Sequence, residues 1–190
     1  MLNIAVFASG GGSNLQAIID ACRSGRIDVQ VCAVISNNAN AFALRRAKEA
    51  GIPAYCLTEE AAILSVLRKH ETDLIFLAGY LKKIGHSILN AYDIYNIHPS
   101  LLPKYGGKGM YGIHVHKAVL AAGETETGIT IHKVDVEYDT GQIMAQRVIE
   151  VLPSDTPEVL STRVLEQEHV FIVEFLKNIP STIVNNPNFC

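Results

Sequence analysis

Asn96 and His98 are the residues of this sequence whose types and spacing best suit chemistry. They stand two positions apart, where the hydrophobic run that starts at Ile94 gives way to a loop. On an extended strand such positions project to the same face, and Pro99 favours extended geometry at the residue before it. An amide donor beside an imidazole suits a reaction in which charge develops on a carbonyl oxygen and a proton moves. The same spacing also fits a turn with a solvated histidine, so both interpretations stay open here.

A carboxylate-rich segment later in the chain is a candidate partner for His98. It reads Asp135-Val136-Glu137-Tyr138-Asp139-Thr140-Gly141 and connects two expected strands. An ionised carboxylate near an imidazole raises the pKa of the ring and holds it protonated at neutral pH, ready to donate to a developing oxyanion. The alternative is a solvated turn, in which Asp and Gly are common for local reasons.

The third candidate is a glycine loop, Ser9-Gly10-Gly11-Gly12-Ser13-Asn14, between an expected strand and an expected helix. Backbone N–H groups at a helix N-terminus favour an anion. Leu15 stands where a dinucleotide fingerprint needs its third glycine, and no Gly-Lys-Ser/Thr follows for a nucleoside triphosphate. The loop therefore predicts a cradle for one phosphate, unless it only caps the helix.

Histidines raise a metal site as an alternative. His114 and His116, together with His98 and His132, are residue types that bind zinc. However, His114 and His116 fall where a helix is expected to begin, and helical residues two apart do not face each other. We therefore expect no metal.

The elements that must position these residues alternate between strand and helix through the first half of the chain. This alternation is the signature of βαβ units around a parallel sheet. After residue 112 we expect a helix, then two alternating strands that form an antiparallel pair, then a long closing helix and a poorly anchored tail. Expected strands are 3–8, 29–36, 54–57, 73–78, 128–134 and 143–150, and expected helices are 15–22, 42–50, 61–69, 114–122 and 156–176.

Composition agrees with one compact domain over residues 1–190. Nearly half of the 190 residues (48%) are hydrophobic, and the formal net charge is −3 with no basic run that would suggest nucleic acid. No apolar run approaches the ~20 residues of a membrane span, and the start of the chain does not read as a secretory signal. The four cysteines form no Cys-x-x-Cys pair. We expect a cytoplasmic protein that binds neither membranes nor nucleic acids.

Taken in order, these pieces resemble the phosphoribosylglycinamide formyltransferase family, the folate-dependent transformylases of purine synthesis. The resemblance covers almost the whole chain. The segment from Asn96 to Pro103 is shared by several formyl-folate enzymes, whereas the glycine loop and Gln167-Glu168-His169 are typical of this family. The resemblance also rests on the segments Leu77-Ala78-Gly79-Tyr80, Gly128-Ile129-Thr130-Ile131-His132 and Tyr138-Asp139-Thr140-Gly141.

The resemblance implies an α/β, Rossmann-like, doubly wound and mostly parallel sheet with an antiparallel C-terminal part. It implies a phosphate-binding half at about 1–95 and a folate-binding and catalytic half at about 96–190. It also implies small-molecule partners alone, namely phosphoribosylglycinamide and 10-formyltetrahydrofolate as co-substrate, in a monomer or homodimer, and a cis peptide before Pro103.

Residue roles follow from the same resemblance. Asn96, His98 and Asp139 are the expected catalytic group. Gly12, Ser13 and Asn14 are expected to hold the substrate phosphate, and Glu168 the ribose hydroxyls. The expected folate-binding residues are Leu81, Lys82, Lys83, Ile84, Asn96, Asp135, Val136, Glu137, Tyr138 and Asp139.

Some features depart from the family pattern. Lys83 replaces an apolar residue in the expected pterin wall, and residues 106–112 are longer than the compact turn of other members, which suggests a flexible flap. Related activities also remain open: an amino-sugar formyltransferase, a formyltetrahydrofolate hydrolase, or a phosphate-ligand binding protein without catalysis.

Overall fold

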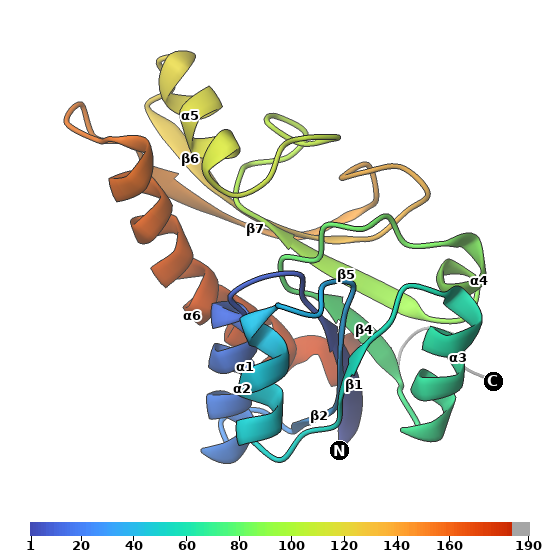
Figure 1. Cartoon of the computed structure of the whole chain (residues 1–190). Helices are drawn as coiled ribbons and strands as arrows, with labels where there is room; N and C mark the ends of the chain where they lie inside the picture. The colour runs from blue at the N-terminus through green and yellow to red at the C-terminus, as the bar shows by residue number, and fades with distance from the viewer. Residues whose placement is uncertain (184–190) are drawn as a thin grey trace.

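The structure, a computed structural model, describes the backbone of residues 1–183 and the side chains of residues 1–179. Its centre is one seven-stranded sheet in the order β3-β2-β1-β4-β5-β6-β7 (Figure 1). The first five strands in this order, from β3 to β5 across the sheet, are parallel, whereas β6 and β7 run antiparallel to their neighbours. The strands are β1 Leu2–Phe7, β2 Val29–Ser36, β3 Ala54–Cys56, β4 Leu74–Leu77, β5 Asp93–His98, β6 Glu126–Lys133 and β7 Ile143–Glu150.

Helices cover both faces of the sheet. Figure 1 shows α1 beside α2 on one side of the sheet and α3 beside α4 on the other. The larger core cluster lies under α1, α2, α5 and α6, and the smaller one under α3 and α4. The helices are α1 Ser13–Arg23, α2 Phe42–Glu49, α3 Glu60–Lys69, α4 His86–Leu89, α5 Ile113–Ala121 and α6 Pro157–Ile183.

Strand alternation explains how both faces are buried. In β1, Ile4 and Val6 belong to the larger cluster, while Ala5 and Phe7 belong to the smaller one. Side chains of a strand alternate between faces, so a strand covered on both sides must be apolar throughout. This explains why the buried part of the first strand, from Ile4 to Phe7, is entirely hydrophobic.

Strand order reverses between β1 and β4. From β1 the chain moves outward through β2 to β3, and then returns to place β4 on the other side of β1. In open α/β sheets the crevice at such a switch point, beyond the carboxyl ends of the strands, is where ligands bind. The glycine loop follows β1, Ala78 follows β4, and His98 ends β5, so the glycine loop, the segment after β4 and the pair Asn96 and His98 meet at that edge.

The predicted fold class is confirmed, with differences at the ends of elements. The short helix α4 was not predicted, and β6 begins at Glu126 rather than at residue 128. The closing helix continues past Leu176 and through Pro180 to Ile183, and the rest of the predicted tail lies outside the described residues. The peptide between Leu102 and Pro103 is cis, as the family resemblance implies.

No helix in the described part of the chain is both long enough and apolar enough to cross a lipid bilayer.

The contact between the glycine loop and α2 generates a stability prediction. Gly12 has a φ of 70°, and a Cβ built on it would lie 2.8 Å from the Cα of Ala43. Gly12→Ala should therefore destabilise the fold by about 1–3 kcal/mol, from left-handed strain and overpacking against backbone. Gly11→Ala is the matched control, because nothing lies within 4 Å of its Cβ position. Urea unfolding measures both, and equal stabilities would contradict the close approach.

Candidate active site

A cleft of about 710 Å³ opens at the carboxyl ends of β1, β4 and β5. Its walls also include residues 107–112, the connection between β6 and β7, and one face of α6. All the residues predicted to bind or react with substrates line this cleft except Val136, whose side chain is 42% exposed. The structure thus brings together residues that are up to 156 positions apart, from Gly12 to Glu168.

Asn14 and Glu168 form a buried pair at the glycine-loop end of the cleft. Asn14 is on the first turn of α1, and its Nδ2 donates to Glu168 Oε2 on α6 at 2.9 Å. Burial raises the pKa of Glu168 to about 7, although the hydrogen bond from Asn14 opposes the shift. Oδ1 of Asn14 is buried without a protein partner in the described structure. This end of the cleft therefore holds free hydrogen-bonding capacity beside a carboxyl group that is easily protonated.

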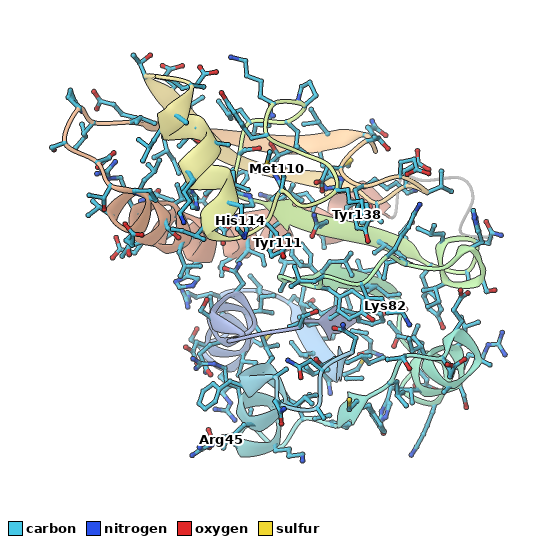
Figure 2. The ribbon with its side chains drawn as sticks, turned by 45° about the horizontal axis from the view of Figure 1, so that its top comes forward. Arg45, Lys82, Met110, Tyr111, His114 and Tyr138 are labelled. Atoms are coloured by element: carbon cyan, nitrogen blue, oxygen red, sulfur yellow. The ribbon has the colours of Figure 1, made fainter. Side chains whose placement is uncertain are left out.

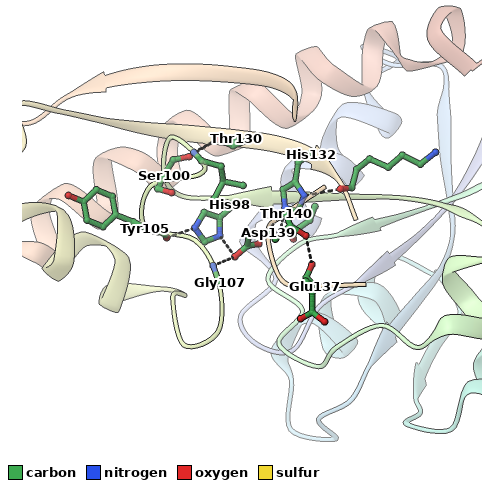
Figure 3. A network of polar contacts seen from close by, with 12 residues as sticks. His98, Ser100, Tyr105, Gly107, Thr130, His132, Glu137, Asp139 and Thr140 are labelled. Carbon is green, nitrogen blue, oxygen red and sulfur yellow. Dashed lines mark hydrogen bonds and ion pairs between the residues drawn. The ribbon is translucent and has the colours of Figure 1, made fainter. Parts of the chain in front are cut away.

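Asn96, His98 and Asp139 converge in the middle of the cleft, as predicted. Asn96 and His98 are on β5 with one residue between them, and His98 Nδ1 lies 3.6 Å from Asp139 Oδ2 (Figure 3). The same Oδ2 accepts a hydrogen bond from the N–H of Gly107 at 2.8 Å. Burial alone would raise the pKa of Asp139, but His132, His98 and the Gly107 N–H together lower it. Asp139 is therefore a carboxylate at neutral pH.

The expected protonation of His98 needs correction. His98 is only 4% exposed, and burial lowers the pKa of its imidazole below the usual value, although Asp139 and the Tyr105 carbonyl act in the opposite direction. Its Nε2 lies 2.8 Å from the Tyr105 carbonyl oxygen, which can only accept. A neutral ring therefore carries its hydrogen on Nε2 and presents the Nδ1 lone pair towards Asp139. The Asp139 carboxylate can therefore stabilise an imidazolium that forms at His98 during a reaction, but it does not keep the ring protonated beforehand.

His132 is a site residue that sequence analysis did not assign to the catalytic group. It lies opposite Asn96 in the register of β5 and β6, and its Nε2 is 3.1 Å from Asn96 Nδ2 and 3.4 Å from Asp139 Oδ1. Its Nδ1 faces the Lys133 carbonyl at 3.0 Å, so a neutral ring donates there and accepts from Asn96 through Nε2. This contact fixes the amide of Asn96 and leaves its second N–H hydrogen for the cleft. The alternating pattern of the predicted strand assigned His132 to one face of the sheet, but only the strand register shows that it meets Asn96.

His116 is a second residue of the cleft that was not predicted. It is 2% exposed on α5, and burial, with a smaller contribution from His98, lowers its pKa to about 4. His114, two residues earlier, is exposed, as the helical spacing predicts. In the described residues, no group of three or more His, Cys, Asp or Glu side chains is arranged to hold a metal ion.

The predicted folate-binding segment after β4 is anchored at its first residue. The N–H of Leu81 donates to Ser9 Oγ at 2.8 Å, which ties the segment to the end of β1. Lys83, the departure from the family pattern, reaches across to the connection between β6 and β7 and contacts Glu137 at 3.2 Å. Ile84 is buried in the smaller core cluster. Lys83 therefore links the segment after β4 to the connection between β6 and β7, while Ile84 packs that segment onto the core.

The predicted flap, residues 106–112, lies on the other side of the cleft, which its residues 107–112 line. Figure 2 shows Met110 and Tyr111 of this segment on the same side as Tyr138, with Lys82 across from them. The flap joins the catalytic group through the Gly107 N–H that Asp139 accepts. Its predicted flexibility stays a prediction.

The buried carboxyl group of Glu168 generates a pH prediction. Because its pKa is about 7 in the folded protein against about 4.5 when unfolded, folding becomes less favourable as pH rises from 4.5 to 7. Glu168→Gln removes this titration and keeps an acceptor for Asn14. The variant should match wild type in free energy of unfolding at pH 4.5 and exceed it at pH 8. Urea unfolding across this range measures the difference, and a constant difference would disprove the shift.

Comparison with known proteins agrees with this geometry. The sequence model of the family described as "Formyl transferase" matches residues 2–176. The chain is 44% identical to the phosphoribosylglycinamide formyltransferase, chloroplastic, of Vigna unguiculata, over 92% of this chain but only 59% of that protein's length. It is 41% identical to the phosphoribosylglycinamide formyltransferase of Haemophilus influenzae, over 89% of this chain and 82% of the relative.

Solved structures give the same answer. The crystal structure of phosphoribosylglycinamide formyltransferase from Bacillus halodurans superposes with a TM-score of 0.88 at 33% identity, over 99% of this chain and 100% of that one. The likeness therefore includes the whole cleft and not the sheet alone. The chain belongs to the formyl transferase family, within its phosphoribosylglycinamide formyltransferase group.

Proposed function

We propose that this chain transfers the formyl group of 10-formyltetrahydrofolate to the amine of 5-phosphoribosylglycinamide, a step of de novo purine biosynthesis. The observation that carries the proposal is one continuous cleft with a glycine loop at one end and Asn96, His98 and Asp139 in the middle. A monophosphate bound at the loop places the far end of its ribonucleotide near the catalytic group.

The substrate end of the cleft suits a phosphorylated ribose. Gly12, Ser13 and Asn14 present backbone N–H groups at the N-terminus of α1, where a phosphate is favoured. Glu168 lies beside Asn14 and is nearly buried, so ribose hydroxyls have an acceptor that water cannot easily reach. Binding here orients the amine of the substrate towards His98 and lowers the entropic cost of reaction.

The opposite end fits a flat heterocycle with hydrogen-bonding edges. Leu81 and Tyr138 are exposed apolar side chains on facing walls, and residues 82–84, 135, 137 and 139 line the same part of the cleft. The formyl-folate supplies an activated one-carbon group when bound. The residues predicted to bind the folate remain part of the proposal, and Val136 would contribute only its backbone.

The catalytic group can stabilise charge and move a proton. As the amine adds to the formyl carbon, the carbonyl oxygen gains negative charge, and the free N–H of Asn96 can donate to it. Such a donor is typically worth ~10²–10³ in rate, or about 2.7–4 kcal/mol. The neutral His98 can take the amine proton on Nδ1, directly or through a water held by Asp139, and the adjacent carboxylate then stabilises the imidazolium. As the carbonyl re-forms, the bond between the formyl carbon and N10 breaks and this proton passes from His98 to N10, so that tetrahydrofolate leaves and His98 is neutral again. General acid–base catalysis contributes roughly 10²–10⁴.

Related reactions of the same cofactor class make different demands. A formyltetrahydrofolate hydrolase or an amino-sugar formyltransferase would also use Asn96, His98 and Asp139, but neither explains a loop built for a lone phosphate. Absorbance during consumption of a formyl-folate analogue, with and without phosphoribosylglycinamide, separates them. Turnover that does not depend on phosphoribosylglycinamide would reject the proposal.

A cytoplasmic location and a monomer or homodimer stay predictions, and the Vigna relative is named as chloroplastic.

Asp139→Asn tests the catalytic group. The amide keeps the size of the side chain but cannot stabilise an imidazolium at His98, so kcat should fall about tenfold or more. Circular dichroism should show a folded protein, because the substitution is isosteric. Near-normal turnover would remove Asp139 from the mechanism.

Ser13→Ala tests the phosphate end. Contacts with phosphate persist from the ground state to the transition state, so their loss should raise KM for phosphoribosylglycinamide more than it lowers kcat. Steady-state kinetics at saturating formyl donor measures both constants. An effect on kcat alone would contradict the assignment.

A further inference from the structure

We propose that Arg46, a residue outside the cleft, positions the glycine loop for phosphate binding by holding the carbonyl of Gly11 from behind. The identity of the substrate in this inference rests on the proposed function. The effect of Arg46 on the affinity of the loop for phosphate does not. Arg46 is on α2, and its Nε donates to the carbonyl oxygen of Gly11 at 2.8 Å.

Three consecutive carbonyls of the loop are held on the side away from the cleft. Gly10 O accepts from the N–H of Ala43 at 3.0 Å, Gly11 O accepts from Arg46, and Gly12 O accepts from the N–H of Gln16 at 2.9 Å. Two of these donors belong to the backbone of α2 and α1. Arg46 is the one side chain among the three, so it is the one that substitution can remove.

Because the peptide group is planar, the contacts that hold these carbonyls also fix the direction of the neighbouring N–H groups. In a trans peptide the C=O of one residue and the N–H of the next point in opposite directions. Holding the carbonyls of Gly10, Gly11 and Gly12 from behind therefore aims the N–H groups of the following residues, 11 to 13, away from those donors and towards the cleft that they line. In the described structure none of the three N–H groups donates to a protein atom. Successive free N–H groups of this kind form an anion-binding concavity.

Arg46 is itself held in place by several contacts. Its guanidinium lies 4.9 Å from the centre of the Phe42 ring, and Nη1 donates to Gln16 Oε1 at 3.2 Å. Gln16 Nε2 in turn donates to Asp20 Oδ1 at 2.9 Å. A planar guanidinium can make the stacking contact and both hydrogen bonds at once, which a lysine ammonium cannot. Arg46 therefore connects α2 to α1 through Gln16, on the side of the loop where it holds the Gly11 carbonyl.

Arg45 provides a matched control on the same helix. Its guanidinium also lies over the Phe42 ring, at 5.4 Å, but its Nε pairs with Glu49 at 2.7 Å on the surface. Figure 2 shows Arg45 at the outer side of α2, far from Met110 and Tyr111 of the flap. Removing either arginine changes the net charge equally, and only Arg46 contacts the loop.

The first test is kinetic. Arg46→Gln should raise KM for phosphoribosylglycinamide about five- to tenfold, the size of one lost charge-assisted hydrogen bond felt through the loop. The kcat and the KM for the formyl donor should stay within about twofold, because the contact lies behind the phosphate end. Arg46→Lys should be intermediate, and Arg45→Gln should match wild type.

The second test does not depend on the reaction. Inorganic phosphate is titrated into ¹⁵N-labelled wild type, Arg46→Gln and Arg45→Gln. The amide signals of Gly11, Gly12 and Ser13 should shift in wild type and in Arg45→Gln, with a dissociation constant about fivefold higher in Arg46→Gln. Thermal unfolding checks that each variant is folded, and Arg46→Lys takes the place of Arg46→Gln if the latter does not fold.

The outcomes separate the two proposals. If wild type transfers no formyl group but phosphate binding weakens as described, the proposed function fails and the role of Arg46 stands. Equal effects of the two glutamine variants, or unchanged KM and phosphate affinity in Arg46→Gln, would overturn the role of Arg46. So would wild-type protein whose loop amides do not respond to phosphate.

Discussion

Three groups from separate segments converge on the carboxylate of Asp139: the imidazole of His98, the imidazole of His132 and the N–H of Gly107. They come from the end of β5, from β6 and from the flap. The carboxylate therefore fixes the relative positions of the catalytic strand, its antiparallel neighbour and the wall that faces them. Asp139 has a φ of 59°, a left-handed conformation that Asp tolerates better than most residues. The backbone conformation and the three contacts support each other.

Burial decides the charge state of the cleft before a substrate arrives. It lowers the pKa of His98 and His116 and raises that of Glu168, so the groups that titrate near neutral pH are biased towards their uncharged forms. Asp139 is the exception, because the Gly107 N–H donates to its carboxylate and either neighbouring imidazole, once protonated, favours the ionised form. A single fixed negative charge beside neutral bases suits a reaction whose intermediate states create positive charge on an imidazole. The same charge would be much less effective in water.

Local sequence patterns predicted the parts of the site that depend on local geometry. Asn96 and His98 share a strand face because of their spacing, and the glycine loop follows a strand and precedes a helix. The alternation of elements predicted a parallel sheet, whereas the strand order that puts these segments at one edge was seen only in the structure. Composition singled out the carboxylate-rich segment as a candidate partner for His98, but family resemblance selected Asp139 within it and supplied Glu168.

Other features depend on contacts that spacing cannot reveal. His132 meets Asn96 because the two are opposite in the register of β5 and β6, and register is set by the whole antiparallel pair. The salt bridge between Lys83 and Glu137 joins segments 54 positions apart. The sign of the His98 pKa shift was wrong because a nearby carboxylate was weighed without the depth of burial, which only packing determines.

The two nitrogens of His98 also suggest why the flap and the chemistry are connected. Nε2 donates to the carbonyl of Tyr105, a residue with a φ of 56°, and Nδ1 faces Asp139, which holds Gly107. The chain on the two sides of Gly106 thus contacts both ends of one catalytic pair. A Cβ at Gly106 would lie 2.5 Å from Leu102 Cδ2 and 3.2 Å from Asp139 Cβ, so a larger residue where the flap begins would displace the Leu102 side chain and crowd Asp139. A movement of the flap cannot leave the proton-accepting pair unchanged, because the same few residues hold both.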